Sequence, residues 1–333
     1  MSELRRDPFS GGWVVVAPER ARRAAELRRP RPAPVGGLCP FCPGAEALTP
    51  HEVYAARPGA TPRDGPGWTV RVVPNPAPAL RVEGELSRDG EGPFDRVQGI
   101  GAHEVVVETA RHDATLATYS PAELEGVFAA WQARLRDLAQ DGRLRSIAVF
   151  RSEGEGGLLE HPHSQLVALP LLAPALAREL ARTREHFERT ERCLACDVVG
   201  HERRDGARVV AQNELALAYV PFAASRPFEL HLVPRRHASH LEHEGHEVLA
   251  AVASLLSQVV RRLEGALGSP PHQLLLRSGP LREPALASFH WRLELVPQLA
   301  LLPALEAASG LSVNPVAPEE AARFLREHAG ELR

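Results

Sequence analysis

One order of residues occurs twice in this chain and constrains its fold more than any other feature. Each half contains a C-x-x-C pair, a strand-like run that leads to a histidine, a helix, a second strand and a second histidine. Residues 105–112 match residues 230–237 without a gap, and His161 matches His290. An internal repeat with the same residues in the same order indicates two copies of one structural unit. We therefore predict an N-terminal and a C-terminal half of similar fold.

Hydrophobic periodicity predicts the helices and strands of both halves. A capping box begins at Ser120, and apolar side chains recur at spacings of three and four up to Leu138, which predicts a helix that Gly142 can end. Further helices are expected over residues 172–192 and about 246–265. Expected strands, each rich in apolar residues, cover residues 68–73, 104–108, 146–150, 216–220, 228–233, 273–277 and 290–297. The charged, glycine-rich residues 84–97 are expected to form a surface loop.

The four cysteines form two C-x-x-C pairs, one in each half. In a reducing compartment this spacing is typical of metal or redox sites rather than of structural disulfides. Two thiolates and two imidazoles make a closed tetrahedral zinc site, and histidines occupy matching positions in the two halves. The sequence therefore predicts two structural zinc sites, the first formed by Cys39, Cys42, His112 and His161 and the second by Cys193, Cys196, His237 and His290.

The same residues allow other interpretations. Either C-x-x-C pair could be a redox pair or two buried thiols. His103 is a second candidate ligand for the first site, although only His112 has a counterpart, His237, in the repeat. The metal could be zinc or iron, and two thiolates with two imidazoles favour zinc. Three further histidines are expected on the surface: His51, His201 and His240.

The halves differ where the second histidine occurs. The first half reads His-Pro-His-Ser-Gln from residue 161, whereas the second reads His-Trp-Arg-Leu-Glu from residue 290. The leading histidine is present in both, which suits metal ligation, but His163 exists only in the first half, which suits a single reactive site. Side chains two apart on a strand point to the same face, so His161 can be fixed by a metal while His163 faces a substrate.

This arrangement predicts that His163 is a nucleophile. If one ring nitrogen is held by a backbone carbonyl, the other is left as a neutral nucleophile. Gln165 lies on the same face, where its amide could donate a hydrogen bond to a phosphoryl oxygen. The alternative is that His163 is a partly buried strand histidine whose hydrogen bond to a carbonyl has no catalytic consequence.

Composition excludes several classes of function. The chain contains no lysine, so its 39 basic residues are all arginines. This excludes Walker-type phosphate loops and Schiff-base enzymes. A net charge of -3 and a pI near 6.6 give no basic surface for nucleic acid. No apolar run approaches the roughly 20 residues of a membrane-spanning helix, and no apolar leader begins the chain, so we expect a cytoplasmic protein.

Motifs along nearly the whole chain resemble one family. They are the Arg-Asp-Pro start, residues 13–23, the Cys-Pro-Phe-Cys segment, and residues 72–75, 101–105, 161–165, 221–224, 227–229, 290–291 and 313–315. In these motifs the chain resembles the galactose-1-phosphate uridylyltransferase family of the histidine-triad superfamily. It resembles in particular the branch with His-Pro-His-Ser-Gln that includes bacterial uridylyltransferases and plant ADP-glucose phosphorylases.

The resemblance implies a fold and a mechanism. The fold is α+β, with two fused histidine-triad-like halves, residues 1–178 and 179–333, each a mainly antiparallel sheet with packed helices, in a homodimer. The mechanism is a ping-pong transfer in which His163 attacks the α-phosphorus of a nucleotide sugar and releases the sugar 1-phosphate. A second phosphate or sugar phosphate then takes the nucleotidyl group. Because a sugar 1-phosphate is a good leaving group, Gln165 suffices where the family's hydrolases place a third histidine.

The resemblance also implies substrate contacts. Arg20 and Arg23 match the family's arginine loop near the phosphates, and Asn75 matches an asparagine that contacts the nucleoside. Glu306 matches a glutamate that holds sugar hydroxyls and reaches the site from the other subunit. Ser152 stands where the family has a phosphate-contacting asparagine. The substrate-binding residues expected on this basis are Arg20, Arg23, Asn75, Ser152, Ser164 and Glu306.

The chain departs from the family pattern at several positions. Pro76 stands where many uridylyltransferases have an aspartate that contacts the ribose, Ala24 replaces a proline after the arginines, and Ala308 replaces a glycine. The loop between Phe150 and His161 is two residues shorter than is usual, and a second phosphate-contacting serine has no clear counterpart in it. Backbone amides of residues 156 and 157 could substitute for that serine.

These departures leave the nucleotide base undecided. The expected substrates are UDP-glucose and galactose 1-phosphate, and the alternative in the same class is phosphorolysis of ADP-glucose. Alternatives of other classes are a nucleotide hydrolase and a non-catalytic zinc-binding protein.

Overall fold

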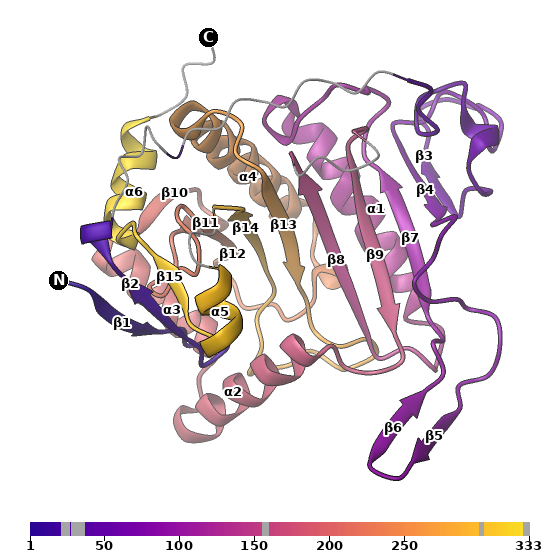
Figure 1. Cartoon of the computed structure of the whole chain (residues 1–333). Helices are drawn as coiled ribbons and strands as arrows, with labels where there is room; N and C mark the ends of the chain where they lie inside the picture. The colour runs from indigo at the N-terminus through magenta and orange to yellow at the C-terminus, as the bar shows by residue number, and fades with distance from the viewer. Residues whose placement is uncertain (21–26, 28–36, 155–159, 300–302, 329–333) are drawn as a thin grey trace.

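The computed structural model describes residues 1–20, 27, 37–154, 160–299 and 303–328. These residues form a ten-stranded sheet in the order β10-β11-β12-β14-β13-β8-β9-β7-β4-β3, in which every neighbouring pair is antiparallel (Figure 1). The strands of the first half are β3 (Tyr54–Ala56), β4 (Val70–Pro74), β7 (Ala102–Val107), β8 (Ser146–Glu153) and β9 (His163–Leu169). Those of the second half are β10 (Val209–Gln212), β11 (Ala216–Tyr219), β12 (Leu230–Pro234), β13 (His272–Arg277) and β14 (Arg292–Pro297).

The strand order follows the internal repeat. β8 and β13 pair in the middle of the sheet, and from this junction the strands run outward as β9, β7, β4, β3 on one side and β14, β12, β11, β10 on the other. Each strand of one half therefore has a counterpart at the same distance from the junction. The structure confirms the predicted α+β fold of two similar halves. Pairing β8 with β13 also removes one exposed edge from each half-sheet.

Two long helices cover one face of this sheet, which we call the helix face (Figure 1). α1 (Pro121–Leu138) packs on β3, β4 and β7, whereas α4 (His246–Leu267) packs on β10, β11 and β12 and against α1. The capping box predicted at Ser120 is present, and Phe128 and Trp131 of the predicted apolar stripe are fully buried. Among the described residues, no helix is long and apolar enough to cross a bilayer.

Shorter elements surround the other face of the sheet, which we call the open face. The side chain of Val199 on α3 (Leu194–Asp205) packs with Leu217, Tyr219 and Val233 of β11 and β12. α2 (Pro174–Thr190) forms the expected connecting helix, and the expected boundary between residues 178 and 179 falls within it. A small sheet pairs β1 (Glu3–Arg6) with β2 (Trp13–Val16) and β2 in parallel with β15 (Ser312–Asn314). The remaining elements are α5 (Pro303–Ser309), α6 (Pro318–Glu327) and the 3-10 helices η1 (Pro18–Arg20), η3 (Glu46–Leu48), η4 (Leu116–Thr118) and η5 (Leu241–His243).

Residues 84–97 contain a hairpin where the sequence predicts a loop. β5 (Arg88–Glu91) and β6 (Phe94–Val97) pair and project from the body of the protein (Figure 1). Every residue of both strands is exposed, so neither face of the hairpin packs against a core that would require apolar side chains. Without alternation of apolar and polar residues, a strand leaves no periodic signal in the sequence.

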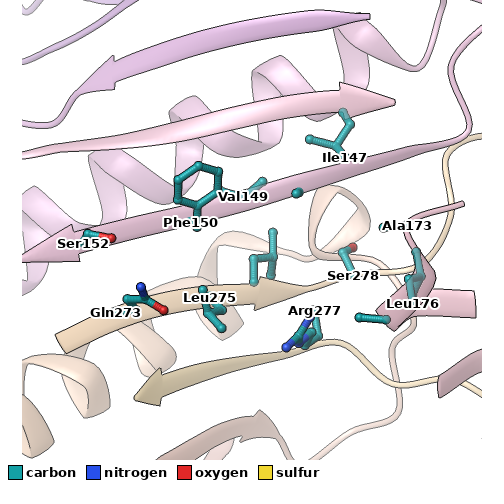
Figure 2. Close-up of a pocket in the computed structure, with 13 residues that line it drawn as sticks. Ile147, Val149, Phe150, Ser152, Ala173, Leu176, Gln273, Leu275, Arg277 and Ser278 are labelled. Carbon is teal, nitrogen blue, oxygen red and sulfur yellow. The ribbon is translucent and has the colours of Figure 1, made fainter. Parts of the chain in front are cut away.

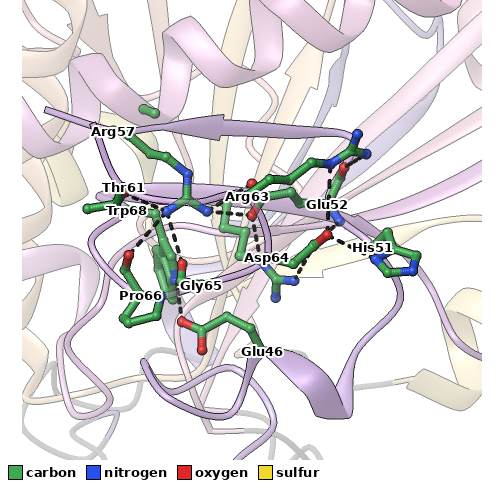
Figure 3. Close-up of polar contacts among 12 residues, drawn as sticks. Glu46, His51, Glu52, Arg57, Thr61, Arg63, Asp64, Gly65, Pro66 and Trp68 are labelled. Atoms are coloured by element: carbon green, nitrogen blue, oxygen red, sulfur yellow. Dashed lines mark hydrogen bonds and ion pairs between the residues drawn. The ribbon is translucent and has the colours of Figure 1, made fainter. Parts of the chain in front are cut away.

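A buried ion-pair network holds the segment between η3 and β4, residues 49–69, against the open face (Figure 3). Arg71 of β4 is 1% exposed and donates to Glu52 and Asp64, while Arg57 donates to both carboxylate oxygens of Glu52. Burial alone raises the pKa of Glu52, but the hydrogen bonds from Arg57 and Arg71 outweigh it and lower the pKa below its ordinary value. The Glu52 carboxylate is therefore charged and doubly paired at neutral pH.

Replacing Arg71 with methionine is expected to lower the free energy of unfolding by about 2–3 kcal/mol, because it removes one of the two arginines that compensate a buried carboxylate. The matched control is Arg96→Met on β6, whose pair with Asp89 is mostly exposed and should contribute much less to stability. Urea unfolding of the three proteins measures both changes. Equal effects of the two substitutions would show that the network adds no more than a surface pair does.

Candidate active site and metal clusters

The first predicted metal site comes together from four separate segments. Cys39 and Cys42 lie before η3, His112 follows β7, and His161 precedes β9. The Nδ1 atom of His161 lies 3.7 Å from the Sγ atom of each cysteine, and that of His112 lies 3.4 Å from the Sγ atom of Cys42. His161 Nε2 donates to the backbone carbonyl of Thr109 at 2.7 Å, which leaves its Nδ1 atom as the ligating nitrogen.

The second site has the same arrangement in the other half. Cys193 and Cys196 lie at the start of α3, His237 follows β12, and His290 precedes β14. The Sγ atom of Cys196 lies 3.5 Å from the Nδ1 atoms of both histidines. His237 Nε2 donates to the carbonyl of Leu286 at 3.0 Å. Within each cluster the four donor atoms lie within 4.8 Å of one another.

Both donor sets fit a tetrahedral metal ion. Zinc bonds of about 2.3 Å to sulfur and about 2.0–2.1 Å to nitrogen place these ligands about 3.6 Å apart in a tetrahedron. The sulfur to nitrogen distances of 3.4–3.7 Å agree with that value. Burial lowers the pKa of His161 and so favours the neutral imidazole that ligates a metal. The predicted sets therefore form two clusters that could hold metal ions, and His103, the rival ligand, belongs to neither.

His163 begins β9 two residues after a ligand of the first cluster. Its Nδ1 atom donates to the backbone carbonyl of His161 at 2.8 Å, as expected for the predicted nucleophile. The ring of Phe41, which lies between the two cysteines of the first cluster, has its centroid 5.6 Å from that of His163. Two contacts therefore fix the His163 ring to the metal cluster, and its Nε2 atom carries the lone pair.

Gln165 and Asn75 meet at a residue that the sequence did not assign to the active site. The Oε1 atom of Gln165 lies 2.7 Å from the Nε2 atom of His103, and the Nδ2 atom of Asn75 lies 3.1 Å from the same nitrogen. Gln165 lies on the same side of β9 as His163, since the two are separated by one residue. The structure thus brings the predicted phosphate-binding and nucleoside-binding residues together through His103.

Ser164 must be corrected as a predicted substrate-binding residue. Its side chain is 0% exposed and its hydroxyl accepts a hydrogen bond from the indole N–H of Trp131 at 2.9 Å. Because successive side chains on a strand alternate, Ser164 points to the helix face while His163 and Gln165 point to the open face. The hydroxyl packs β9 against α1 and does not face the substrate side.

Ser152 lines a pocket on the open face between β8 and β13. Arg151 of β8 pairs with Ser164 of the antiparallel strand β9. Ser152 is the next residue after Arg151, so it lies beside His163, the residue before Ser164. The pocket has a volume of about 270 Å³. Figure 2 shows Ser152 and Gln273 at one end of it, with the apolar side chains of Phe150 and Leu275 between them and the far end. Ser152 is exposed, so its hydroxyl lies on the same open face as His163.

The remaining predicted contacts lie on other elements or outside the described residues. Arg20 is exposed at the end of η1, and Arg23 lies outside the described residues, as do residues 156 and 157. Glu306 on α5 accepts hydrogen bonds from Arg226 on both of its carboxylate oxygens. This ion pair fixes the orientation of the Glu306 carboxylate on the second half of the chain.

Sequence reasoning missed two residues beside His163 and Gln165, and outside the site it placed His240 wrongly. The contact of Phe41 with His163 could have been anticipated from its position within the Cys-Pro-Phe-Cys segment. His103 was considered only as a metal ligand, although it lies on a strand neighbouring β9. His240, expected on the surface, is 2% exposed, with Nδ1 2.7 Å from the Ser239 hydroxyl and Nε2 donating to the carbonyl of Pro280. His51 and His201 are exposed as expected.

Comparison with known proteins places the chain among nucleotidyltransferases. A family model described as galactose-1-phosphate uridyl transferase, N-terminal domain, matches residues 81–172. ADP-glucose phosphorylase of Arabidopsis thaliana is 31% identical over 98% of this chain and 92% of the relative. Galactose-1-phosphate uridylyltransferase of Thermotoga maritima is 30% identical over 100% of both chains.

Two solved structures agree along the whole length. The crystal structure of an ADP-glucose phosphorylase from Arabidopsis thaliana with bound ADP-glucose matches with a TM-score of 0.82 and 29% identity, covering 98% of each chain. A structure of uridylyltransferase matches with a TM-score of 0.77 and 28% identity, covering 99% of this chain and 98% of the other. Relatives this similar over the full length, together with the motif at residues 161–165, show that the chain belongs to the galactose-1-phosphate uridylyltransferase family of nucleotidyltransferases.

Proposed function

We propose that this chain transfers a nucleoside monophosphate by way of a covalent bond to His163. The Nε2 lone pair attacks the α-phosphorus of a nucleotide sugar, a phosphorus–nitrogen bond forms, and the bond to the bridging oxygen breaks to release the sugar 1-phosphate. An acceptor phosphate oxygen then attacks the same phosphorus and breaks the phosphorus–nitrogen bond. The observation that carries this proposal is the 2.8 Å hydrogen bond from His163 Nδ1 to the His161 carbonyl, which in the neutral imidazole puts the proton on Nδ1 and the lone pair on Nε2.

Neighbouring residues supply the rest of the chemistry. The leaving sugar 1-phosphate is stable as an anion, so it needs little proton donation and no general acid stands at Gln165. The Gln165 amide instead donates to a phosphoryl oxygen and stabilises the charge that develops there. The Ser152 hydroxyl, beside His163 at the end of its pocket, contacts the same phosphate.

Two substrate pairs follow from the relatives. The first is UDP-glucose with galactose 1-phosphate, the pair expected from the sequence and from the relative in Thermotoga maritima. The second is ADP-glucose with inorganic phosphate. It is favoured by the TM-score of 0.82 to the enzyme with ADP-glucose bound and by Pro76, which cannot replace the acidic ribose contact of many uridylyltransferases.

One experiment distinguishes these substrates and tests the mechanism. The purified chain is offered each nucleotide sugar with and without its acceptor, and released products and the mass of the intact protein are recorded. We expect one nucleotide sugar to add a nucleotidyl group to the protein without an acceptor, and its acceptor to remove that group. Steady release of nucleoside monophosphate into water would instead identify a hydrolase. No reaction and no adduct with either pair would overturn the proposal.

We also propose that both Cys2His2 clusters hold zinc. The two thiol and two imidazole donors of each cluster, at distances that suit a tetrahedron, support this metal. When bound, zinc would have no open position for a substrate in a closed four-ligand site, so its contribution is structural. We further propose a cytoplasmic homodimer in which Glu306 approaches the partner subunit's His163.

A further inference from the structure

We propose that His103 is a positioning residue that fixes the orientation of the Gln165 amide for phosphoryl transfer. This assignment rests on the proposed function, because Gln165 acts there as a hydrogen-bond donor to phosphate. An amide side chain offers an oxygen on one side and an NH2 group on the other. Only the NH2 group can stabilise an anionic phosphoryl oxygen, and the oxygen would repel it.

The hydrogen bonds of His103 determine which side of the amide faces the substrate. The backbone N–H of Ala79 lies 3.1 Å from His103 Nδ1, and since a backbone N–H can only donate, Nδ1 must be the unprotonated nitrogen of the ring. The proton of the neutral imidazole is therefore on Nε2. Of the two atoms near Nε2, only the Oε1 atom of Gln165, at 2.7 Å, can accept that proton. The NH2 group of Gln165 is thus left for the substrate.

The strand register places His103 where it can make this contact from a rigid position. On β7, Val105 pairs with Gln165 and His103 pairs with Val167, so His103 and Gln165 are diagonal neighbours on the same face of adjacent strands. The carbonyl of His103 also accepts the backbone N–H of Asn75 at 2.8 Å. The ring is therefore held through Ala79, and the backbone that carries it is bonded to Asn75 after the end of β4.

Asn75 lies beside this pair and is oriented by a different contact. Its Oδ1 atom accepts the backbone N–H of Ala77 at 2.9 Å, which turns its own NH2 group toward His103. With the His103 proton on Nε2, this NH2 group cannot donate to the ring, so Ala77 orients Asn75 while His103 orients only Gln165. Loss of that imidazole would leave the Gln165 amide free to rotate and to present its oxygen to the phosphate in part of the molecules.

The test uses His103→Leu and the matched variant His103→Gln, whose amide nitrogen can occupy the place of Nε2 and keep the hydrogen bond. We expect His103→Leu to slow formation of the nucleotidyl-protein about 10- to 100-fold in single-turnover measurements with little change in KM, since an oriented donor to the developing charge is lost. His103→Gln should recover most of the rate. Thermal unfolding of both variants verifies that they are folded.

A double-mutant comparison separates positioning from a general structural role. If His103 acts only through Gln165, then Gln165→Ala and the combined Gln165→Ala with His103→Leu should form the nucleotidyl-protein at the same rate. Losses that multiply, or a His103→Leu variant as fast as the natural chain, would overturn the assignment while leaving the proposed function intact. A natural chain that forms no adduct with either nucleotide sugar contradicts the proposed function, and the assignment with it.

Discussion

Replacement of His163 by alanine is expected to abolish formation of the nucleotidyl-protein and to lower turnover at least about a thousand-fold, because it removes the nitrogen that forms the covalent intermediate. The side chain on the open face of β9 beside His163 is Gln165, which has no nucleophilic nitrogen. The second half offers no substitute, since Arg292 stands at the matching position and is buried in ion pairs with Glu179 and Glu294.

Incubation with nucleotide sugars labelled at the α-phosphate measures this loss. The label should become bound to the natural chain in an acid-labile form, as a phosphorus–nitrogen bond requires, and should be absent from His163→Ala. His246→Ala is the control, because His246 is an exposed histidine whose removal from the start of α4 should leave labelling unchanged. Persistence of the label in His163→Ala would refute the covalent mechanism.

Loss of a metal ligand is expected to have different consequences in the two halves. Cys42→Ser and Cys196→Ser should each remove one equivalent of zinc and lower the Tm by at least about 5 °C, since structural zinc sites contribute directly to folding. Only Cys42→Ser should also slow formation of the nucleotidyl-protein, by about 100-fold, because a displacement of about 1 Å at a reacting group has a cost of this size. The cause is that His163 is bonded to the carbonyl of His161 and packed against Phe41.

Metal analysis, thermal unfolding and single-turnover rates on the same preparations test this prediction, with each variant acting as the control for the other. The rates are to be measured well below the Tm of the less stable variant so that unfolding does not contribute. Equal rates for Cys42→Ser and the natural chain would show that the first cluster does not orient His163. Fewer than two zinc equivalents in the natural chain would mean that one cluster holds no zinc.

Local spacing was sufficient to predict much of the site. The C-x-x-C pairs, the histidines at matching positions and the repeat itself led to both metal clusters, because the ligands of a closed site keep a fixed order along the chain. Alternation along a strand likewise placed His163 and Gln165 on one face. The same alternation predicts that Ser164, which lies between His163 and Gln165, points to the opposite face, where its hydroxyl accepts a hydrogen bond from Trp131.

Contacts between distant segments could not be predicted in this way. His103 meets Gln165 only because β7 pairs with β9 in one register, and Glu306 meets Arg226 across 80 residues. The hairpin at residues 88–97 leaves no periodic signal because both of its strands are exposed at every residue. The burial of His240 depends on a contact with Pro280, 40 residues away.

The sequence by itself determined the candidate residues for the chemistry of this protein: the members of two Cys2His2 clusters that could hold metal ions, one unduplicated histidine and the glutamine two residues after it. The tertiary structure alone decided how those side chains are oriented, that His103 contacts the Gln165 side chain, and that Ser152 rather than Ser164 lies on the open face. The physical reason is that residue type and spacing fix what a group can do and the face on which it lies. Strand order and register decide which other groups it touches.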